Sequence, residues 1–204
     1  MTGNAYDALL FDLGGVVLDI DLRRIFARWA ELTSCDVALL QKRFAPDETF
    51  LRHETGHLAD DLFFERVRAM LGIDLSDAEF LDGWNAIFTG EMPGISGTLA
   101  AAAAKLPLYA FSNTNRPHQS YFSEQFAGVL SHFKHVFASS DIGLRKPDAE
   151  AFEFVLDAIG FPAGRILFFD DSLANVEGAR ACGLQAVHVT SASTVQETLA
   201  ALVL

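Results

Sequence analysis

The chain has 204 residues, half of them apolar, and its 27 acidic and 15 basic side chains give a net charge of −12. That apolar fraction excludes a disordered chain, and no uncharged apolar run approaches the ~20 residues of a membrane helix. The negative charge opposes nucleic acid and anionic membranes as partners. The length allows one sizeable core and a smaller accessory domain.

The N-terminal segment and the cysteines favour a cytoplasmic location. No basic patch precedes the first apolar run and Asp12 interrupts that run, so a signal peptide is not expected. Cys35 and Cys182 lie far apart and form no paired motif, which suits free thiols in a reducing compartment.

The first predicted element is a strand that ends in a carboxylate. Residues 8–11 are all apolar, Asp12 follows them, and Gly14 and Gly15 come next. A run without polar alternation is typical of a strand covered by helices on both faces. A carboxylate at its end would lie in the crevice where open α/β sheets bind ligands, and glycines let the backbone approach a ligand closely. The simpler alternative is a solvated aspartate at a glycine turn.

The next block, from Asp21 to residue 88, shows only helical periodicity. Asp21 is placed to cap a first helix, and Ser76 and Glu79 have capping-box spacing at the start of a later one. No strand is expected in this block, and residues 91–94 have the composition of a linker. Further amphipathic helices are predicted over residues 37–44, 59–71 and 77–88.

After the linker, short apolar strands alternate with helices. The last helix begins at Ser193, with Gln196 at capping-box spacing. Strands are predicted at residues 108–111, 136–139, 166–169 and 186–189, and helices at residues 96–106, 148–159 and 173–182. This alternation predicts an α/β fold with a doubly wound parallel sheet. We expect a core domain of residues 1–18 and 90–204, with residues 19–89 as an all-helical insertion after the first strand.

Polar side chains follow the predicted strands, so they should gather at one edge of the sheet. Converging carboxylates repel one another unless a metal lies between them, and hard oxygen ligands without a His or Cys pair favour Mg²⁺. A lysine, an amide and a hydroxyl would surround a phosphate, and an aspartate can attack its phosphorus atom. The groups in question are Asp12, Ser112, Asn113, Lys146, Asp170, Asp171 and Asn175.

These motifs, in this order, resemble the haloacid dehalogenase superfamily of phosphatases. The stretches that carry the resemblance are residues 11–16 (FDLGGV), 111–115 (FSNTN), 145–147 (RKP) and 168–172 (FFDDS). The resemblance implies a Rossmann-like core with a helical cap and Mg²⁺ as cofactor. It implies that Asp12 is the nucleophile and a metal ligand, that Asp171 is the second metal carboxylate, and that Asp170 lies in the outer shell of the metal or joins it.

The resemblance also assigns the phosphate-binding groups. Ser112, Asn113 and Lys146 would hold the phosphate, Lys146 would also restrain Asp12, and Asn175 would support Asp171. The most similar subgroup is the bacterial sugar-phosphate phosphatases that act on α-D-glucose 1-phosphate. Its members resemble this chain at residues 11–14, 18–21, 53–56, 112–116, 144–147 and 168–171.

One position departs from the family pattern. Most members have a second aspartate two residues after the nucleophile, where it protonates the leaving oxygen, but this chain has Gly14, whose carbonyl could still bind Mg²⁺. Losing a general acid typically costs about 10²–10⁴-fold in rate. An anomeric hydroxyl is more acidic than an ordinary alcohol, so Gly14 favours glycosyl 1-phosphates as substrates. Asp19, Asp21 and His118 are the candidate replacement acids.

Four residues are candidate substrate contacts, namely Arg116, His118, Glu54 and Trp84. For Trp84 a place in the hydrophobic core is the stronger interpretation, and Arg116 and His118 are equally compatible with facing solvent. Glu54 lies in an H-E-x-x-H pattern that could indicate a zinc site if both histidines shared one helical face. The Thr-Gly pair inside that pattern weakens a helix, so we interpret this segment as a turn of the cap.

Three functions fit these residues, and a Mg²⁺-dependent phosphatase of small phosphorylated metabolites is favoured. A hydrolytic dehalogenase shares the aspartate nucleophile and lacks the second aspartate, but it works without metal, whereas Asp170 and Asp171 suit a metal. A non-catalytic module that binds a phosphorylated ligand is the third, and the presence of Asp12 argues against it. No pattern in the sequence indicates the physiological substrate or the oligomeric state.

Overall fold

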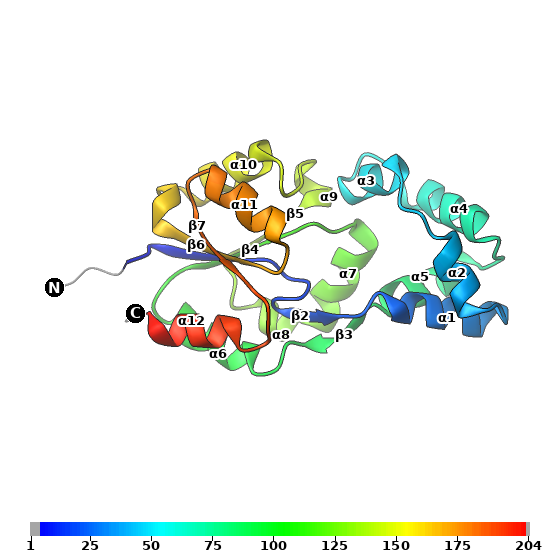
Figure 1. Ribbon diagram of the computed structural model, residues 1–204, viewed down its shortest axis with the longest axis horizontal. Helices are drawn as coiled ribbons and strands as arrows, with labels where there is room; N and C mark the ends of the chain where they lie inside the picture. The colour runs from blue at the N-terminus through cyan, green and yellow to red at the C-terminus, as the bar shows by residue number, and fades with distance from the viewer. Residues whose placement is uncertain (1–4, 203–204) are drawn as a thin grey trace.

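The computed structural model describes residues 5–202 and shows a parallel sheet between two layers of helices, with a helical lobe beside it (Figure 1). The strand order is β5-β4-β1-β6-β7, and every neighbouring pair is parallel. This confirms the predicted doubly wound sheet. The strands are β1 (Ala8–Phe11), β4 (Leu108–Ser112), β5 (His135–Ala138), β6 (Ile166–Asp170) and β7 (Gln185–His188).

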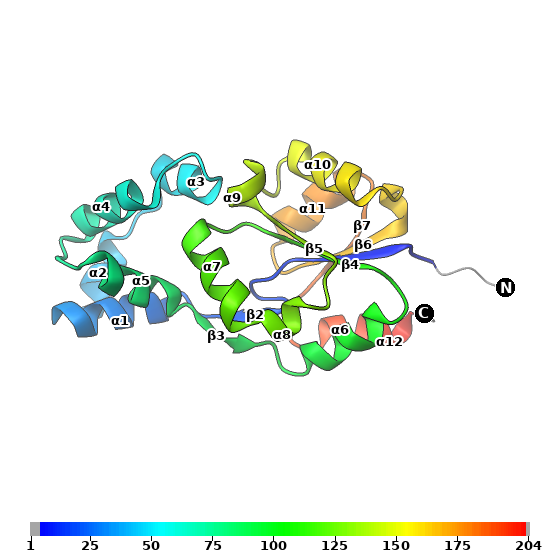
Figure 2. The same ribbon diagram turned by 180° about the vertical axis from the view of Figure 1, so that it is seen from behind.

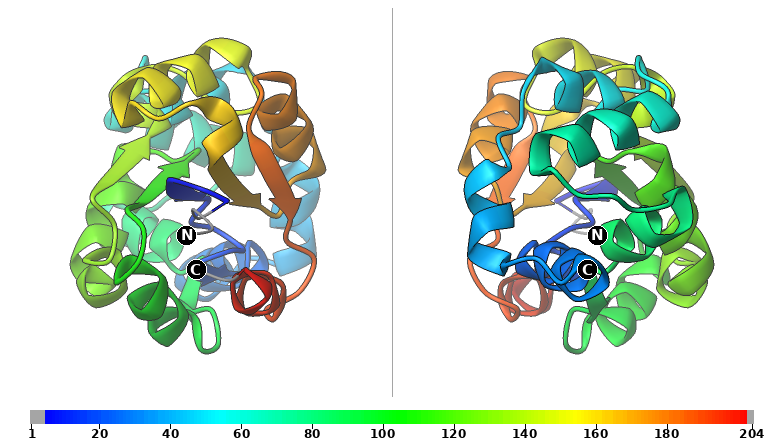
Figure 3. Two further views of the ribbon diagram at one scale, coloured as in Figure 1. Left: turned by 90° about the vertical axis from the view of Figure 1, so that its left-hand side faces the viewer. Right: turned by 90° about the vertical axis from the view of Figure 1, so that its right-hand side faces the viewer.

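Strand β1 lies at the centre of the sheet, where helices cover both faces. All four of its side chains are apolar, and two of them pack on each face. Leu9 and Phe11 pack on the face covered by α6 and α12, whereas Ala8 and Leu10 pack on the face covered by α10 and α11. Figures 2 and 3 show these two helical layers from behind and from the ends. The first layer contains α6 (Ile95–Ala103), α7 (Arg116–Gln125), α8 (Ala127–Leu130) and α12 (Thr194–Ala201). The second contains α9 (Ser139–Ile142), α10 (Ala149–Ile159), the 3-10 turn Ala163–Arg165 and α11 (Leu173–Ala181).

The lobe beside the sheet has a hydrophobic cluster of its own. Trp29, Phe63, Phe80 and Trp84 are buried at its centre, where their rings pack edge-on or stacked. Its helices are α1 (Arg23–Thr33), α2 (Val37–Arg43), α3 (Glu48–Glu54), α4 (Asp60–Leu71) and α5 (Asp77–Asn85). The sequence predicts four of these five helices and misses α3, which is only seven residues long.

A two-stranded antiparallel ribbon joins the lobe to the sheet, although no strand is expected in the block up to residue 88. It consists of β2 (Leu18–Ile20) and β3 (Phe88–Glu91), with an irregular register between Asp19 and Ile20. The helix expected to reach residue 88 ends at Asn85, because Phe88 pairs with Ile20 instead. The expected boundaries 18/19 and 89/90 therefore fall inside the strands of this ribbon.

A second contact between lobe and sheet lies at the end of α3, beside α9 in Figure 1. Arg145 Nε donates to Glu54 Oε1 at 2.6 Å, and Ser139 Oγ donates to the carbonyl of Glu54 at 2.8 Å. Gly56 follows at a positive φ of 72° and lies against the Ser140 carbonyl, so a side chain at residue 56 would collide with that backbone. This segment therefore connects the two parts of the molecule.

The two predicted capping boxes have different outcomes. Ser76 Oγ accepts a hydrogen bond from the Glu79 N–H at 3.3 Å and Glu79 accepts one from the Ser76 N–H at 2.9 Å, which confirms the first box. The box at Ser193 is absent because Gln196 Nε2 donates to the Pro93 carbonyl at 2.7 Å, in the turn before α6. Among residues 5–202, no helix is long and apolar enough to span a bilayer.

Candidate active site

The polar residues that follow the strands do gather at one edge of the sheet. Asp12 follows β1, Ser112 ends β4 and Asp170 ends β6, and these three strands are neighbours and parallel. A pocket of about 200 Å³ opens at this edge. Its polar lining includes Asp12, Ser112, Asn113, Thr114, Lys146 and Asp171.

Lys146 is the buried centre of this site, with a side chain only 1 % exposed. Its ammonium Nζ lies 2.9 Å from Asp12 Oδ1 and 2.7 Å from Asp170 Oδ2. It also lies over the faces of Phe111 and Phe168, at 5.3 and 5.4 Å from the ring centres. A buried ammonium needs such partners, because its desolvation is otherwise too costly.

Asn113 holds the backbone of Lys146 in place. Its Nδ2 donates to the Lys146 carbonyl at 2.8 Å, and its Oδ1 accepts from the Lys146 N–H at 2.9 Å. The family resemblance implies that this amide binds phosphate, but in the structure both its polar atoms contact the backbone of Lys146. No local sequence pattern predicts this contact, because Asn113 and Lys146 are 33 residues apart in the chain.

Asp170 is completely buried, and several protein groups donate to its carboxylate. Besides Lys146, its carboxylate accepts from the Ser172 N–H at 2.8 Å and from Asn175 Nδ2 at 3.0 and 3.1 Å. The expectation that Asn175 supports Asp171 is therefore wrong. The reason is burial, because a carboxylate removed from water requires several donors and Asp171 is partly solvated.

Asp171 points from the end of β6 towards the first glycine turn. A side chain at Gly15 would place its Cβ 2.5 Å from Asp171 Oδ2, so only glycine fits there, with its φ of 74°. Oxygen atoms of Asp12, Asp170 and Asp171 lie within 4.8 Å of one another, and this group could hold a metal ion. Gly14, whose carbonyl is the expected third ligand, lines the same pocket.

The electrostatics of the pocket favour an added cation. Burial raises the pKa of Asp12 to about 7, although Lys146 opposes the shift. Burial also raises the pKa of Asp171, with Asp170 adding to it. For Lys146, burial alone would lower the pKa, but Asp12 and Asp170 outweigh it and raise the pKa. Three carboxylates and one ammonium leave an excess of negative charge that a divalent cation would offset.

Of the four candidate substrate contacts, only His118 lines this pocket. Trp84 is buried in the cluster of the helical lobe, and its Nε1 donates to Asn115 Oδ1 at 3.3 Å. Glu54 is paired with Arg145. Arg116 is exposed at the start of α7 and lines a separate cleft with Asp60.

His53 and His57 of the H-E-x-x-H pattern do not face each other across a metal site. His53 is buried, its Nε2 lies 2.8 Å from Asp60 Oδ1, and its ring stacks on Phe63 at 3.8 Å. His57 is exposed and its Nδ1 contacts Thr55 Oγ1 at 3.0 Å. His53 is therefore a structural residue of the helical lobe.

Comparison with known proteins agrees with this arrangement: residues 6–183 match the family described as haloacid dehalogenase-like hydrolase. The chain belongs to this family. Among related sequences, a sesquiterpene phosphatase of Aspergillus oryzae is 26% identical over 91% of this chain and 90% of that protein. A D-ribitol-5-phosphate phosphatase of Bacteroides thetaiotaomicron is 23% identical over 87% of this chain and 88% of that protein.

Solved structures of the family share the fold of this hydrolase. An aspartate-to-alanine mutant of a haloacid dehalogenase family enzyme from Bacteroides thetaiotaomicron, complexed with magnesium and inorganic phosphate, is 25% identical with a TM-score of 0.79. The alignment covers 89% of this chain and 93% of that chain. An L-2-haloacid dehalogenase of Xanthobacter autotrophicus is 21% identical with a TM-score of 0.65, over 90% of this chain and 77% of that chain, which shows the fold alone.

The other side of the pocket of this hydrolase is apolar, and none of its residues is among the site residues predicted from the sequence. They are Leu13, Leu18, Ile20, Ile87, Phe88 and Phe122. The apolar-polar alternation of residues 18–21 is a strand signal that could have indicated β2. Nothing in that pattern shows that Ile20 would line the same pocket as Asp12, because the position of Ile20 depends on pairing with Phe88.

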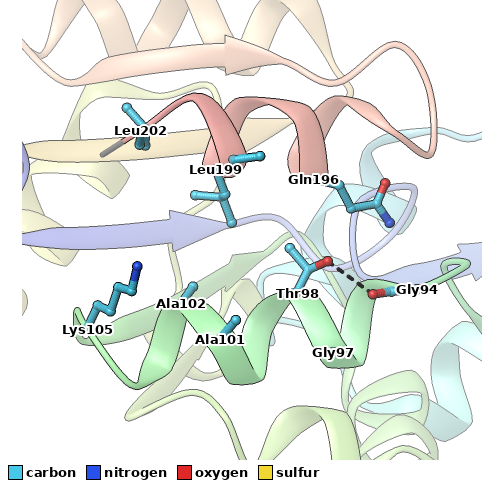
Figure 4. A pocket seen from close by; sticks show the side chains of 10 residues that line it. Gly94, Gly97, Thr98, Ala101, Ala102, Lys105, Gln196, Leu199 and Leu202 are labelled. Carbon is cyan, nitrogen blue, oxygen red and sulfur yellow. Dashed lines mark hydrogen bonds between the residues drawn. The ribbon is translucent and has the colours of Figure 1, made fainter. Parts of the chain in front are cut away.

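A larger cavity, of about 490 Å³, lies between α6 and α12 (Figure 4). Gly97, Ala101 and Leu199 line it, and Thr98 Oγ1 donates to the Gly94 carbonyl at its rim. None of its described lining residues is acidic. The chemistry described above therefore belongs to the smaller pocket at the strand ends.

Proposed function

We propose that this hydrolase is a Mg²⁺-dependent phosphatase of small phosphorylated metabolites that works through an aspartyl-phosphate intermediate. The observation that carries the proposal is the position of Asp12, whose carboxylate lies 2.9 Å from the buried Lys146 ammonium in a pocket shared with Asp171. The phosphatases among its relatives, and the 25% identical structure with magnesium and phosphate, support this function.

The donor set fits Mg²⁺. Asp12 and Asp171 offer carboxylate oxygens and Gly14 offers a backbone carbonyl, and hard oxygen ligands are what this ion prefers. Bound there, it would neutralise charge on the phosphoryl oxygens. Asp170 is the least available ligand of the three aspartates, because Lys146, Ser172 and Asn175 already occupy its oxygens.

The residues of the pocket have separate roles in the two steps of the reaction. A carboxylate oxygen of Asp12 attacks phosphorus, the bond to the ester oxygen breaks, and the leaving group departs with that bond's electron pair. Water then attacks the phosphorus of the acyl phosphate, which releases phosphate and restores the Asp12 carboxylate. Lys146 holds Asp12 in position and offsets the charge of the phosphoryl group, and Ser112 lines the same pocket.

The proposed substrates are a narrower class than phosphorylated metabolites in general, because Gly14 has no side chain that could protonate the leaving oxygen. Phosphates on an acidic hydroxyl should react faster than phosphates on an ordinary alcohol, so glucose 1-phosphate is the expected sugar-phosphate substrate in preference to glucose 6-phosphate. Residues 19–89 serve as the cap that limits access to the pocket, since the β2–β3 ribbon from which they project supplies part of its lining.

The test is phosphate release from a broad panel of phosphorylated metabolites, with and without Mg²⁺, by the native chain and by Asp12→Asn. We expect phosphate release that depends on Mg²⁺. Asp12→Asn should reduce the rate by at least about 10³-fold, because catalytic groups act together and removal of the nucleophile alone abolishes most of their effect. Leu62→Asn, an exposed site on α4, is the control. Metal-independent halide release from 2-haloacids would instead support a dehalogenase, and absence of turnover of every compound would support a binding module.

A further inference from the structure

The pocket has two chemically different walls. Charged and polar groups lie at the strand ends, whereas the wall on the side of the β2–β3 ribbon consists of Ile20, Ile87 and Phe88, above the buried Leu18 and Phe122. A phosphoryl group beside Asp12 and Lys146 would therefore direct its leaving group towards the apolar wall.

Ile20 occupies the space into which a side chain at Gly14 would project. A Cβ built on Gly14 lies 3.0 Å from Ile20 Cδ1 and 3.9 Å from Cγ1. Ile20 is 39 % exposed and lines the pocket, so it lies at the mouth of the pocket. The place of the absent acid is thus filled by hydrocarbon.

Among the described residues that line the pocket, none replaces that acid. The titratable ones are Asp12, His118, Lys146 and Asp171. Asp12 and Asp171 are the proposed metal ligands, and Lys146 is paired with Asp12 and Asp170. His118 Nε2 donates to the Trp84 carbonyl at 3.0 Å, and its Nδ1 lies 3.2 Å from Asn115 Nδ2. Both ring nitrogens are therefore engaged. Asp19 and Asp21 lie outside the lining, and Asp21 is paired with Arg23.

We propose that Ile20 determines specificity, and that this hydrolase prefers phosphomonoesters whose first group beyond the ester oxygen is apolar, such as benzyl or allylic phosphates. The proposal rests on the proposed phosphatase function, and it ranks apolar phosphomonoesters above sugar phosphates as substrates of the same site, with glucose 1-phosphate ahead of glucose 6-phosphate only among the sugar phosphates. Its physical basis is desolvation. A hydroxyl pressed against Ile20, Ile87 and Phe88 loses water and finds no side-chain partner there, which disfavours polyol phosphates by about 10-fold or more.

The decisive comparison uses two phosphates of primary alcohols with similar acidity, benzyl phosphate and glycerol 1-phosphate, so that leaving-group acidity does not decide the outcome. We expect kcat/KM of the native chain to favour benzyl phosphate by at least about 10-fold. A glycerol 1-phosphate rate equal to or above that of benzyl phosphate overturns the proposal. Absence of Mg²⁺-dependent turnover with every phosphate would instead count against the proposed function.

Substitution of Ile20 then tests the residue itself. Ile20→Asn should bring the ratio between the two substrates towards one, whereas Leu39→Asn should leave it unchanged. Leu39 is the matched control because it is 41 % exposed, lies on α2 and does not line the pocket. Thermal unfolding verifies that both variants are folded, and an unchanged ratio in folded Ile20→Asn overturns the role of Ile20.

A double substitution tests whether Ile20 takes the place of the acid. Gly14→Asp alone should gain little, because its side chain meets Ile20 at 3.0 Å. Gly14→Asp combined with Ile20→Ala should raise the rate on glycerol 1-phosphate by about 10²-fold, the lower end for a positioned general acid. The gain should be much smaller on 4-nitrophenyl phosphate, whose leaving group needs no proton. A full gain in Gly14→Asp alone would contradict this placement.

Discussion

His118 shows how the surroundings of one side chain decide its chemistry. It lies on α7 at the wall of the pocket, stacks on Trp84 with ring centres 4.8 Å apart, and is 8 % exposed. Burial lowers the pKa of His118 to about 4, and the Trp84 carbonyl offsets only part of that shift. The imidazole is therefore neutral at pH 7, which suits a structural link between α7 and the helical lobe and not a general acid.

His118 should make the stability of the protein depend on pH. Its pKa is below that of the unfolded chain, so its contribution is complete above pH 6.5 and is lost as the pH falls towards 4. Between pH 7.5 and pH 5 the loss should be about 2 kcal/mol of the free energy of unfolding. Urea titrations of the native chain and His118→Gln at both pH values measure it. The variant should lack this part of the pH dependence, and equal dependence in both proteins would contradict the assignment.

At the scale of elements, the helical lobe depends on close approach between α1 and α5. Gly83, in the last turn of α5, is buried against the indole of Trp29, and a Cβ at that position would overlap the ring. Trp29 is completely buried and its Nε1 donates to the Phe80 carbonyl at 3.1 Å, so it has little freedom to move. By contrast, Gly97 in α6 is exposed and a Cβ there would meet nothing within 4 Å.

These two glycines predict opposite effects of the same substitution. Alanine gains about 1 kcal/mol over glycine in a helix, but overpacking typically costs about 1–3 kcal/mol or more. Gly83→Ala should therefore lower the free energy of unfolding by about 1 kcal/mol or more, whereas Gly97→Ala should raise it by about 0.5–1 kcal/mol. Equilibrium urea unfolding distinguishes the two signs, and stabilisation by Gly83→Ala would show that Trp29 can move away.

Over the whole molecule, the carboxylates of the pocket connect separate parts of the chain. Asp12 and Asp170 come from neighbouring strands 158 residues apart in sequence, and Lys146 links them from the loop after α9. Only folding brings these groups together, so a cation that binds them binds the folded state and not the unfolded one. Such a ligand stabilises the fold in proportion to the logarithm of its concentration.

Mg²⁺ should therefore raise the melting temperature. At about 100 times its dissociation constant it adds about 2.7 kcal/mol, which corresponds to a shift of roughly 5–10 °C for a chain of this size. Chelation should reverse the shift, and Asp171→Asn should reduce it at the same Mg²⁺ concentration. Differential scanning fluorimetry measures both effects. A melting temperature that does not respond to Mg²⁺ at concentrations supporting turnover would contradict binding by Asp12 and Asp171.

The parallel sheet, the helical lobe and the residues that follow the strands could be predicted from the amino-acid sequence, because burial periodicity and motif order are local properties. Which of those residues meet depends on the folded structure. In the folded protein Asn175 donates to Asp170, and Asn113 accepts from the backbone N–H of Lys146. Glu54 accepts from Arg145, 91 residues away, and Ile20 lies over Gly14. Contacts of this kind depend on packing between elements distant in sequence, and no local pattern specifies them.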